Sequence, residues 1–307
     1  MLRSLSQCAK QFPTKLTSVF AAFLVFATTM VCLPAQSQQA KTAETSSPAG
    51  APKGKAFAKP ADAAAALYAA AVRNDDQELL VILGPDAKDV ITWSDDANER
   101  REQREQFAQK YNQMHRLVRE PDNTVALYVG AENWPLPIPI VEYHGAWYFG
   151  TVMGKQEIRY RRIGRNEVAA IEVCRALADA EKDYRSEAHQ YTAKFVSDTG
   201  SHDGLYWKSA DNSKKSPIGP YLAHAGLSAS GAVNSEPYHG YYYRILLHGS
   251  DDFAILAFPA MYRSSGVMTF LVNPDGTAYE KDLGDRTAVL AKEINSDHPD
   301  STWKQVD

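Results

Sequence analysis

The spacing of apolar residues divides the chain into helical and extended stretches. Between residues 60 and 117, apolar side chains recur every three or four positions, which is typical of amphipathic helices. We expect a first helix that begins at Pro60, a second that stops at Gly84 and Pro85, and a third with a capping-type start at Ser94. The dense Arg and Glu residues of the third helix are expected to form a solvated face.

The spacing then changes to every second residue. Residues 123–152 contain the runs NTVALYVG, PLPIPIVEYHG and AWYFGTV, in which apolar residues alternate with others and glycines separate the runs. Pro135, Pro137 and Pro139 occupy alternate positions, and each lacks the N–H that a central strand would donate. The sequence therefore predicts antiparallel strands here, with the proline-rich run at an edge.

The longest helical pattern covers residues 154–188. Its expected apolar face consists of Ile163, Val168, Ile171, Leu177 and Ala178. Gly164 interrupts this pattern, and because glycine weakens a helix, we expect two helices with a bend between them.

The last third of the chain predicts an antiparallel meander of four strands. Three alternating runs lie at residues 241–247, 253–258 and 267–272, and a tight turn with the sequence NPDG leads into the fourth, TAYEKDLG. Helices followed by antiparallel strands thus occur twice, so the predicted fold class is α+β. We expect an N-terminal α+β domain with a curved sheet over residues 56–155, and a long helix packed on the meander over residues 156–307.

The first 37 residues have a different character. Three basic residues precede an apolar stretch at residues 16–33, and no acidic residue occurs before Glu44. With the small residues that follow, this pattern predicts a signal peptide over residues 1–37 and a flexible leader over residues 38–55. We expect a periplasmic or secreted protein. The apolar stretch is about as long as a minimal membrane span, so an uncleaved segment that anchors the protein in the inner membrane stays open as the alternative.

The net charge and the cysteine content indicate which kinds of ligand and covalent link the protein can have. Residues 1–37 hold three of the 33 basic residues and none of the 37 acidic ones, so the remainder carries a formal charge of 30 − 37 = −7. Such a protein offers no surface that neutralises phosphates, and we expect no binding to nucleic acid. Cys174 is the one cysteine after residue 37, which excludes an internal disulfide and a cysteine zinc site there. We expect it to be a buried helical thiol.

The sequence contains no motif of a known catalytic or metal centre. It has no G-x-S-x-G nucleophile elbow, P-loop, dinucleotide-binding fingerprint or H-E-x-x-H pair. The eight histidines are scattered, so no metal site and no cofactor are predicted. Glu280 and Asp282 would lie about 7 Å apart on one face of a strand, which paired-carboxylate glycosidase chemistry would accept. Charges that keep a strand edge solvated are the favoured interpretation.

Six segments together resemble the DUF2950 family of exported bacterial proteins. They are LGPDAKDVI, NWPLPIPIV, GRNEVAAIEVCRA, DGLYW, EPYHGYYYRIL and SGVMTFLVNPDGTAYEKDLG, and the similarity spans about residues 57–303. This resemblance implies export but no particular activity. The N-terminal pattern is similar to the cystatin/NTF2-like cone, and the long helix and meander resemble the headgroup of type IV pilins and pseudopilins. A whole domain precedes the helix here, so filament assembly of the usual pilin type is not implied.

One stretch near the C-terminus is rich in aromatic residues. In YHGYYYRILL, residues 238–247, a strand would place Tyr241 and Tyr243 on one face and Tyr242 and Arg244 on the other. Since each buried phenol needs a partner, we expect one face packed on the long helix and one partly open. The open face would offer a shallow site for sugars, peptidoglycan fragments or partner proteins. The predicted ligand-binding residues are Tyr206, Trp207, Tyr238, His239, Tyr241, Tyr243 and Arg244.

Two hypotheses for the function follow. The first is a non-enzymatic binding or assembly module of the cell envelope, with an envelope protein or a glycan-type ligand as its partner. The second is a periplasmic hydrolase with a site in the N-terminal pocket or around His239. A closed pocket with converging ionisable groups would favour the enzyme, whereas an open aromatic surface would favour binding. Contact with a membrane is expected only through an uncleaved signal segment.

Overall fold

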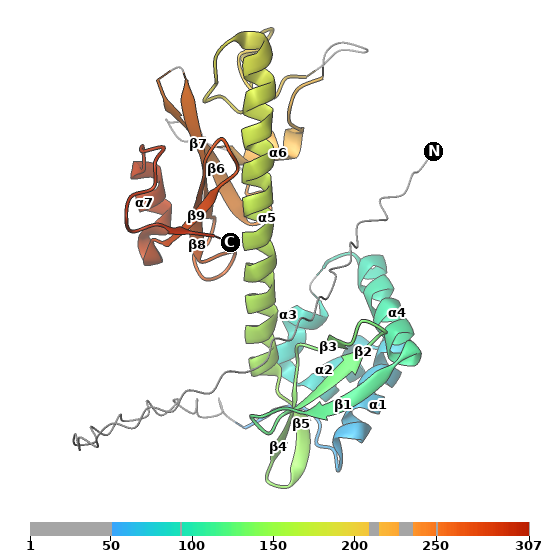
Figure 1. Cartoon of the computed structure of the whole chain (residues 1–307). Coiled ribbons are helices and arrows are strands. Elements are labelled where there is room, and N and C mark those ends of the chain that lie inside the picture. The colour runs from blue at the N-terminus through green and yellow to red at the C-terminus, as the bar shows by residue number, and fades with distance from the viewer. Residues whose placement is uncertain (1–50, 93, 209–214, 227–235, 250, 307) are drawn as a thin grey trace, which may run out of the picture. The chain divides into compact units, whose positions relative to one another are not determined.

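The computed structural model describes residues 51–92, 94–208, 215–226, 236–249 and 251–306. Within these residues the chain forms helices and two antiparallel sheets of five strands each (Figure 1). The predicted α+β class is therefore confirmed. The predicted signal peptide and most of the predicted leader lie outside the described residues.

The N-terminal half begins with a layer of helices. They are α1 (Pro60–Val72), α2 (Asp76–Leu83), the 3₁₀ turn η1 (Pro85–Ala87), α3 (Lys88–Ile91) and α4 (Ala97–Gln113). Pro60 occupies the first turn of α1, where an N–H would have no helical partner. Asp96 caps α4 by accepting a hydrogen bond from the Asn98 N–H at 2.8 Å. The cap predicted at Ser94 is thus wrong, and its hydroxyl accepts instead from the Asp96 N–H at 3.1 Å.

The first sheet has the strand order β1–β2–β4–β5, and β3 pairs with β2. Its strands are β1 (His115–Arg119), β2 (Val125–Val129), β3 (Trp134–Pro135), β4 (Ile140–Tyr143) and β5 (Ala146–Phe149). The predicted third helix ends earlier than expected, because Met114 is extended and His115 already belongs to β1. The core between helices and sheet contains Leu67 of α1, Ile82 of α2 and Phe149 of β5.

Helix α5 (Thr151–Ala188) is one continuous helix of 38 residues, about 57 Å long. The predicted bend at Gly164 is therefore wrong. This glycine is exposed and has no atom near the position of a Cβ, so only its weak helix propensity opposes the helix. Val168 is 61% exposed and does not join the apolar face, which contains Ile163 and Cys174 instead. In the part of the chain that the structure describes, none of the helices combines the length and the apolar character needed to span a bilayer.

The second sheet is a meander with the order β10–β9–β8–β7–β6. Its strands are β6 (Tyr241–His248), β7 (Asp252–Pro259), β8 (Met268–Val272), β9 (Ala278–Asp282) and β10 (Lys304–Gln305). The four predicted strands are present, and the predicted turn closes with a hydrogen bond from the Gly276 N–H to the Asn273 carbonyl at 2.9 Å. The short fifth strand β10 was not predicted, because two residues carry no periodic signal.

Helices cover both faces of the second sheet (Figure 1). Helix α5 packs on the face that contains Tyr241 and Tyr243, and α6 (Pro220–Ala225) adds to the same core. The opposite face, with Leu246 and Leu256, packs against α7 (Thr287–Glu293), which follows the 3₁₀ turn η2 (Gly284–Arg286). The sequence did not predict α7, so the expectation of a partly open face is wrong where α7 covers it.

Candidate functional site

Tyr241 and Tyr243 belong to the core beneath α5. Both side chains are fully buried, at 0% exposure. The Tyr241 hydroxyl donates to the Met268 carbonyl at 3.0 Å, and the Tyr243 hydroxyl donates to the Tyr238 carbonyl at 3.2 Å. Burial raises the pKa of both phenols, because a phenolate here would lose its hydration. Both rings act as neutral core side chains and offer no surface to a ligand in this structure.

Arg244 lies on the opposite face of β6 and is covered by α7, with 6% exposure. Its guanidinium donates to the carbonyls of Ala291 at 2.8 Å, Lys292 at 3.1 Å and Ile294 at 2.9 Å. Carbonyls at the end of a helix lack partners within the helix and carry the negative end of its dipole. Arg244 thus fixes the C-terminal end of α7 on the sheet.

The other four predicted residues lie on segments that flank β6. Trp207 is buried and stacks on His202, with ring centroids 4.4 Å apart. Tyr206 and Tyr238 are partly buried and pack against the core beneath β6. His239 is exposed, and its ring lies 4.3 Å from that of Tyr238. The four tyrosines of the predicted set thus pack in or against the core and do not form an exposed aromatic surface. Ligand binding by the seven residues stays a prediction.

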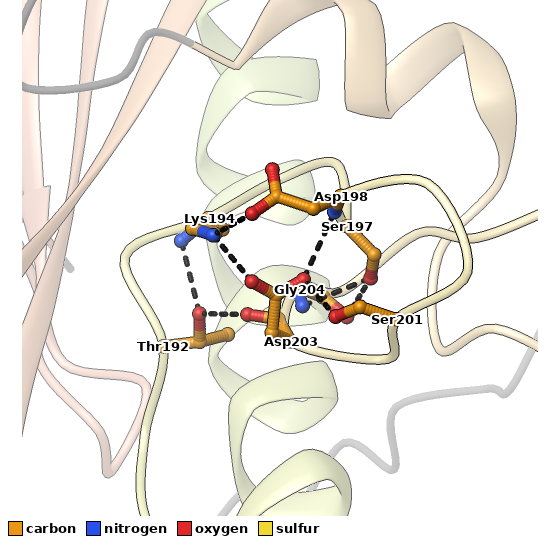
Figure 2. Close-up of polar contacts among 7 residues, drawn as sticks. All are labelled: Thr192, Lys194, Ser197, Asp198, Ser201, Asp203 and Gly204. Atoms are coloured by element: carbon orange, nitrogen blue, oxygen red, sulfur yellow. Dashed lines mark hydrogen bonds and ion pairs between the residues drawn. The ribbon is translucent and has the colours of Figure 1, made fainter.

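A cluster of polar contacts shapes the loop that follows α5 (Figure 2). Lys194 pairs with Asp198 at 2.7 Å and also with Asp203. Asp203 accepts further hydrogen bonds from the Asp198 N–H at 2.9 Å and from the Ser201 hydroxyl at 2.6 Å. The hydrogen bond from Lys194 is the main cause that lowers the Asp203 pKa, and hydrogen bonds to Asp198 and Asp203 raise the Lys194 pKa. Both groups stay charged near neutral pH, so the cluster suits a structural role better than proton transfer.

A buried carboxyl of α5 contacts the same loop. Glu181 is fully buried, and its Oε2 accepts a hydrogen bond from the Thr192 N–H at 3.1 Å. Its Oε1 has no hydrogen-bond partner among the described residues. Burial raises the pKa of Glu181 to about 8, and the bond from Thr192 lowers it only in part. Perturbed carboxyls are common at functional sites, but 0% exposure shields this one from any substrate. We interpret Glu181 as a protonated acid that anchors the loop.

An open apolar groove of about 220 Å³ lies on the N-terminal half. Side chains from α1, α2, α3 and α4 line it, together with Trp134, residues 136–138 and Ile158 of α5. Trp134 is 42% exposed, and the Arg161 guanidinium lies 5.4 Å from the centre of its ring. Arg161 belongs to α5, and a hydrogen bond that it donates to the Pro135 carbonyl at 2.7 Å holds its side chain beside Trp134.

Two arginines of α4 supply charge to the groove. Arg104 forms an ion pair with Asp76 at 2.5 Å and donates to the Ile91 carbonyl at 3.3 Å. Arg100 donates through Nη1 to the Ser94 carbonyl, but its buried Nε has no hydrogen-bond partner among the described residues. A guanidinium stays charged at all accessible pH values, so it suits recognition of a carboxylate and not proton transfer. A carboxylate beside an apolar group would suit the apolar lining and the two guanidinium groups together.

Sequence reasoning assigned the Arg and Glu residues of α4 to a solvated face and so missed this groove. Arg100, Arg104 and Phe107 follow one another at spacings of four and three, which places them on one side of the helix. That spacing was the signal that could have identified them.

The sequence analysis also missed a cluster of side chains of metal-ligand type. In the described part of the chain, Asp252, Asp297 and His298 bring ligand atoms within 4.8 Å of one another.

The family of the chain follows from a comparison with family models. The model for DUF2950, described as a protein of unknown function, matches residues 54–306. The chain belongs to the DUF2950 family. The groove and the second sheet both lie within the matched part of this DUF2950 chain. Searches of curated proteins and of solved structures give no match to it. The predicted family is confirmed, while export and the likeness to pilin headgroups stay predictions.

Proposed function

We propose that this DUF2950 protein is an exported, non-enzymatic binding module of the cell envelope. Its ligand is a segment of an envelope protein that offers an apolar side chain next to a carboxylate. The observation that carries the proposal is the apolar groove together with the two guanidinium groups, of Arg100 and Arg104, in its lining. Export is supported by the composition of residues 1–37, which lie outside the described residues.

The size of the groove supports a side chain as its occupant. At about 220 Å³ it is smaller than the pockets of roughly 300–1,000 Å³ that hold drug-sized ligands. Burial of one large apolar side chain contributes about 1.5–3 kcal/mol. A hydrogen bond from Arg100 to a carboxylate would contribute about 1.5–3 kcal/mol more. Both contributions favour a peptide segment over a glycan, which would bring few apolar groups.

The character of the groove supports binding over hydrolysis. Its charged lining residues are Arg100 and Arg104, and a guanidinium cannot exchange a proton near neutral pH. The alternative site around His239 has an exposed imidazole beside the ring of Tyr238. Among the described residues, neither arrangement pairs a nucleophile with a base in the way that hydrolysis requires.

Photo-crosslinking at the groove tests this proposal. A photoreactive phenylalanine analogue replaces Trp134 in the full chain, and crosslinked segments are identified by mass spectrometry of the envelope fraction. Tyr221, which is 81% exposed, carries the same analogue in a control protein. We expect one segment that is captured only from position 134 and that has an acidic residue or a C-terminal carboxylate beside an apolar residue.

A synthetic peptide of the captured segment then tests the role of Arg100. Arg100→Gln should weaken its binding by about 10–100-fold, the cost of a lost charge-assisted hydrogen bond. Arg101→Gln is the matched control, since this neighbour is 54% exposed and pairs with Glu105 outside the groove. Equal affinity of both variants, or the same adducts from positions 134 and 221, would contradict the proposal.

A further inference from the structure

The β6–β7 hairpin places two side chains of metal-ligand type opposite each other. His248 ends β6, Asp252 begins β7, and the two residues are direct partners in the antiparallel register. Directly opposed residues have Cβ atoms about 4.5–5.5 Å apart on the same face of a sheet. That face is the one that α7 covers, since Leu246 on it packs with Ala291.

The segment after α7 brings two more side chains of metal-ligand type, those of Asp297 and His298. Arg244 holds its start by donating to the Ile294 carbonyl at 2.9 Å and to Asn295 Oδ1 at 3.3 Å. The Ser296 hydroxyl then donates to the His298 carbonyl at 3.0 Å and shapes the turn that presents Asp297 and His298. Arg244 is thus a positioning residue for this turn.

Asp252, Asp297 and His298 bring their ligand atoms together, and His248 lies beside the carboxylate of Asp297. His248 Nδ1 lies 3.3 Å from Asp297 Oδ1, and His298 Nε2 lies 3.5 Å from Asp297 Oδ2. Ligand atoms of Asp252, Asp297 and His298 all lie within 4.8 Å of one another. Four ligands at about 2.0–2.1 Å from a tetrahedral Zn²⁺ are separated by roughly 3.3–3.4 Å. The two distances from histidine nitrogens to Asp297 are close to this separation, and Asp252 lies within the wider limit of 4.8 Å from Asp297 and His298.

The burial of Asp297 is an independent observation. This carboxylate is only 5% exposed, and its Oδ2 has no hydrogen-bond partner among the described residues. In a typical hydrogen bond, the imidazole nitrogen would lie about 2.9–3.0 Å from the carboxylate oxygen. Both histidine nitrogens lie farther than this from the oxygens of Asp297. A buried carboxylate oxygen without a hydrogen bond is costly, and a cation beside Asp297 Oδ2 would remove that cost.

We propose that Asp252, Asp297 and His298 bind a divalent cation of the Zn²⁺ type, with His248 paired to Asp297 beside the ion. One imidazole and two carboxylates leave a fourth position for water, and an imidazole ligand suits Zn²⁺ and its neighbours, whereas Ca²⁺ and Mg²⁺ take oxygen ligands. The two carboxylates balance the charge of the ion. The side chains of His248 and His298 are 70% and 65% exposed, so the ion has a path from solvent. The Phe253 N–H donates to Asp252 Oδ1 at 2.8 Å and orients that ligand.

Zn²⁺ binding to the full chain tests this proposal. Tag-free protein, stripped of metal, competes with a chromogenic chelator for Zn²⁺, and Co²⁺ serves as a spectroscopic probe of tetrahedral coordination. We expect one equivalent of Zn²⁺ per chain and visible Co²⁺ bands of tetrahedral intensity. His298→Gln removes an exposed ligand without disturbing the core, and Asp297→Asn removes the central one.

Each variant should weaken Zn²⁺ binding by about 100-fold or more, beyond the 10–100-fold typical of losing an outer partner. His239→Gln is the matched control, an exposed histidine outside the cluster, and should bind as the parent protein does. If Asp297→Asn fails to fold, His298→Gln alone decides. Less than one equivalent bound by the parent, or unchanged affinity of His298→Gln, would overturn the site.

Discussion

Replacing Glu181 by glutamine should stabilise the protein above neutral pH and remove most of a pH dependence. In the fold the pKa of Glu181 is raised from 4.5 to about 8 by burial. Between these two pH values the folded protein keeps a proton that the unfolded chain has lost. The free energy of unfolding therefore falls as pH rises through this window and levels off above pH 8. Glutamine keeps the length of the side chain and an oxygen that can accept the bond from the Thr192 N–H.

The size of the effect follows from the change in pKa. A rise from 4.5 to about 8 opposes folding by roughly 4–5 kcal/mol once the carboxyl is ionised, at about 1.4 kcal/mol for each pH unit. This is an upper bound, because local opening of the loop would let the carboxylate meet water at a lower cost. We therefore expect Glu181→Gln to gain about 2–4 kcal/mol over the parent protein at pH 9, and little at pH 5.

Urea unfolding followed by circular dichroism at pH 5, 7 and 9 measures this difference. Glu172→Gln is the control, an exposed carboxyl on the same helix, and should change stability little at any pH. A difference between Glu181→Gln and the parent that stays constant from pH 5 to pH 9 would refute the reasoning, since only an ionising group can produce the predicted slope.

Three further predictions concern the packing of α5 and α7. Arg244→Met should cost about 2–4 kcal/mol in urea unfolding, because the carbonyls at the end of α7 lose their donor; an unchanged midpoint would contradict this. Gly164→Ala should raise stability by roughly 0.8–1 kcal/mol, since nothing lies near its Cβ position. The matched change Gly154→Ala should lower stability by about 1–3 kcal/mol, because its Cβ would lie 2.7 Å from the Cα of Ile138. Cys174 should react with thiol reagents only upon unfolding, since it is fully buried and burial raises its pKa; rapid labelling of the native protein would contradict this.

Periodicity was sufficient to predict the fold class and most elements. The alternation in Tyr241–His248 and its neighbours identified the strands of the second sheet, and the strong apolar period around Cys174 identified α5. It failed where tertiary packing overrides local preference. Gly164 weakens a helix, yet α5 packs on both sides of it and stays continuous. Helix α7 is only seven residues long, too short for a reliable periodic signal.

The functional side chains were harder to predict because distance along the chain hides them. His248 and His298 are fifty positions apart in the sequence, and only the end of β6 and the turn after α7 bring them to Asp297. A search for closely spaced ligand motifs cannot find such a cluster. Arg100 lies in a run of charged residues that favours a solvated face, and only its position beside the groove distinguishes it from Arg101.

The affinity of the captured peptide for three proteins is the most direct test of the proposed binding function. Titration by fluorescence anisotropy compares the parent protein, Arg100→Gln and Arg101→Gln. The groove predicts that Arg100→Gln binds about 10–100-fold more weakly and that Arg101→Gln binds as tightly as the parent. If both variants retain the parent affinity, the groove that Arg100 lines is not the binding site.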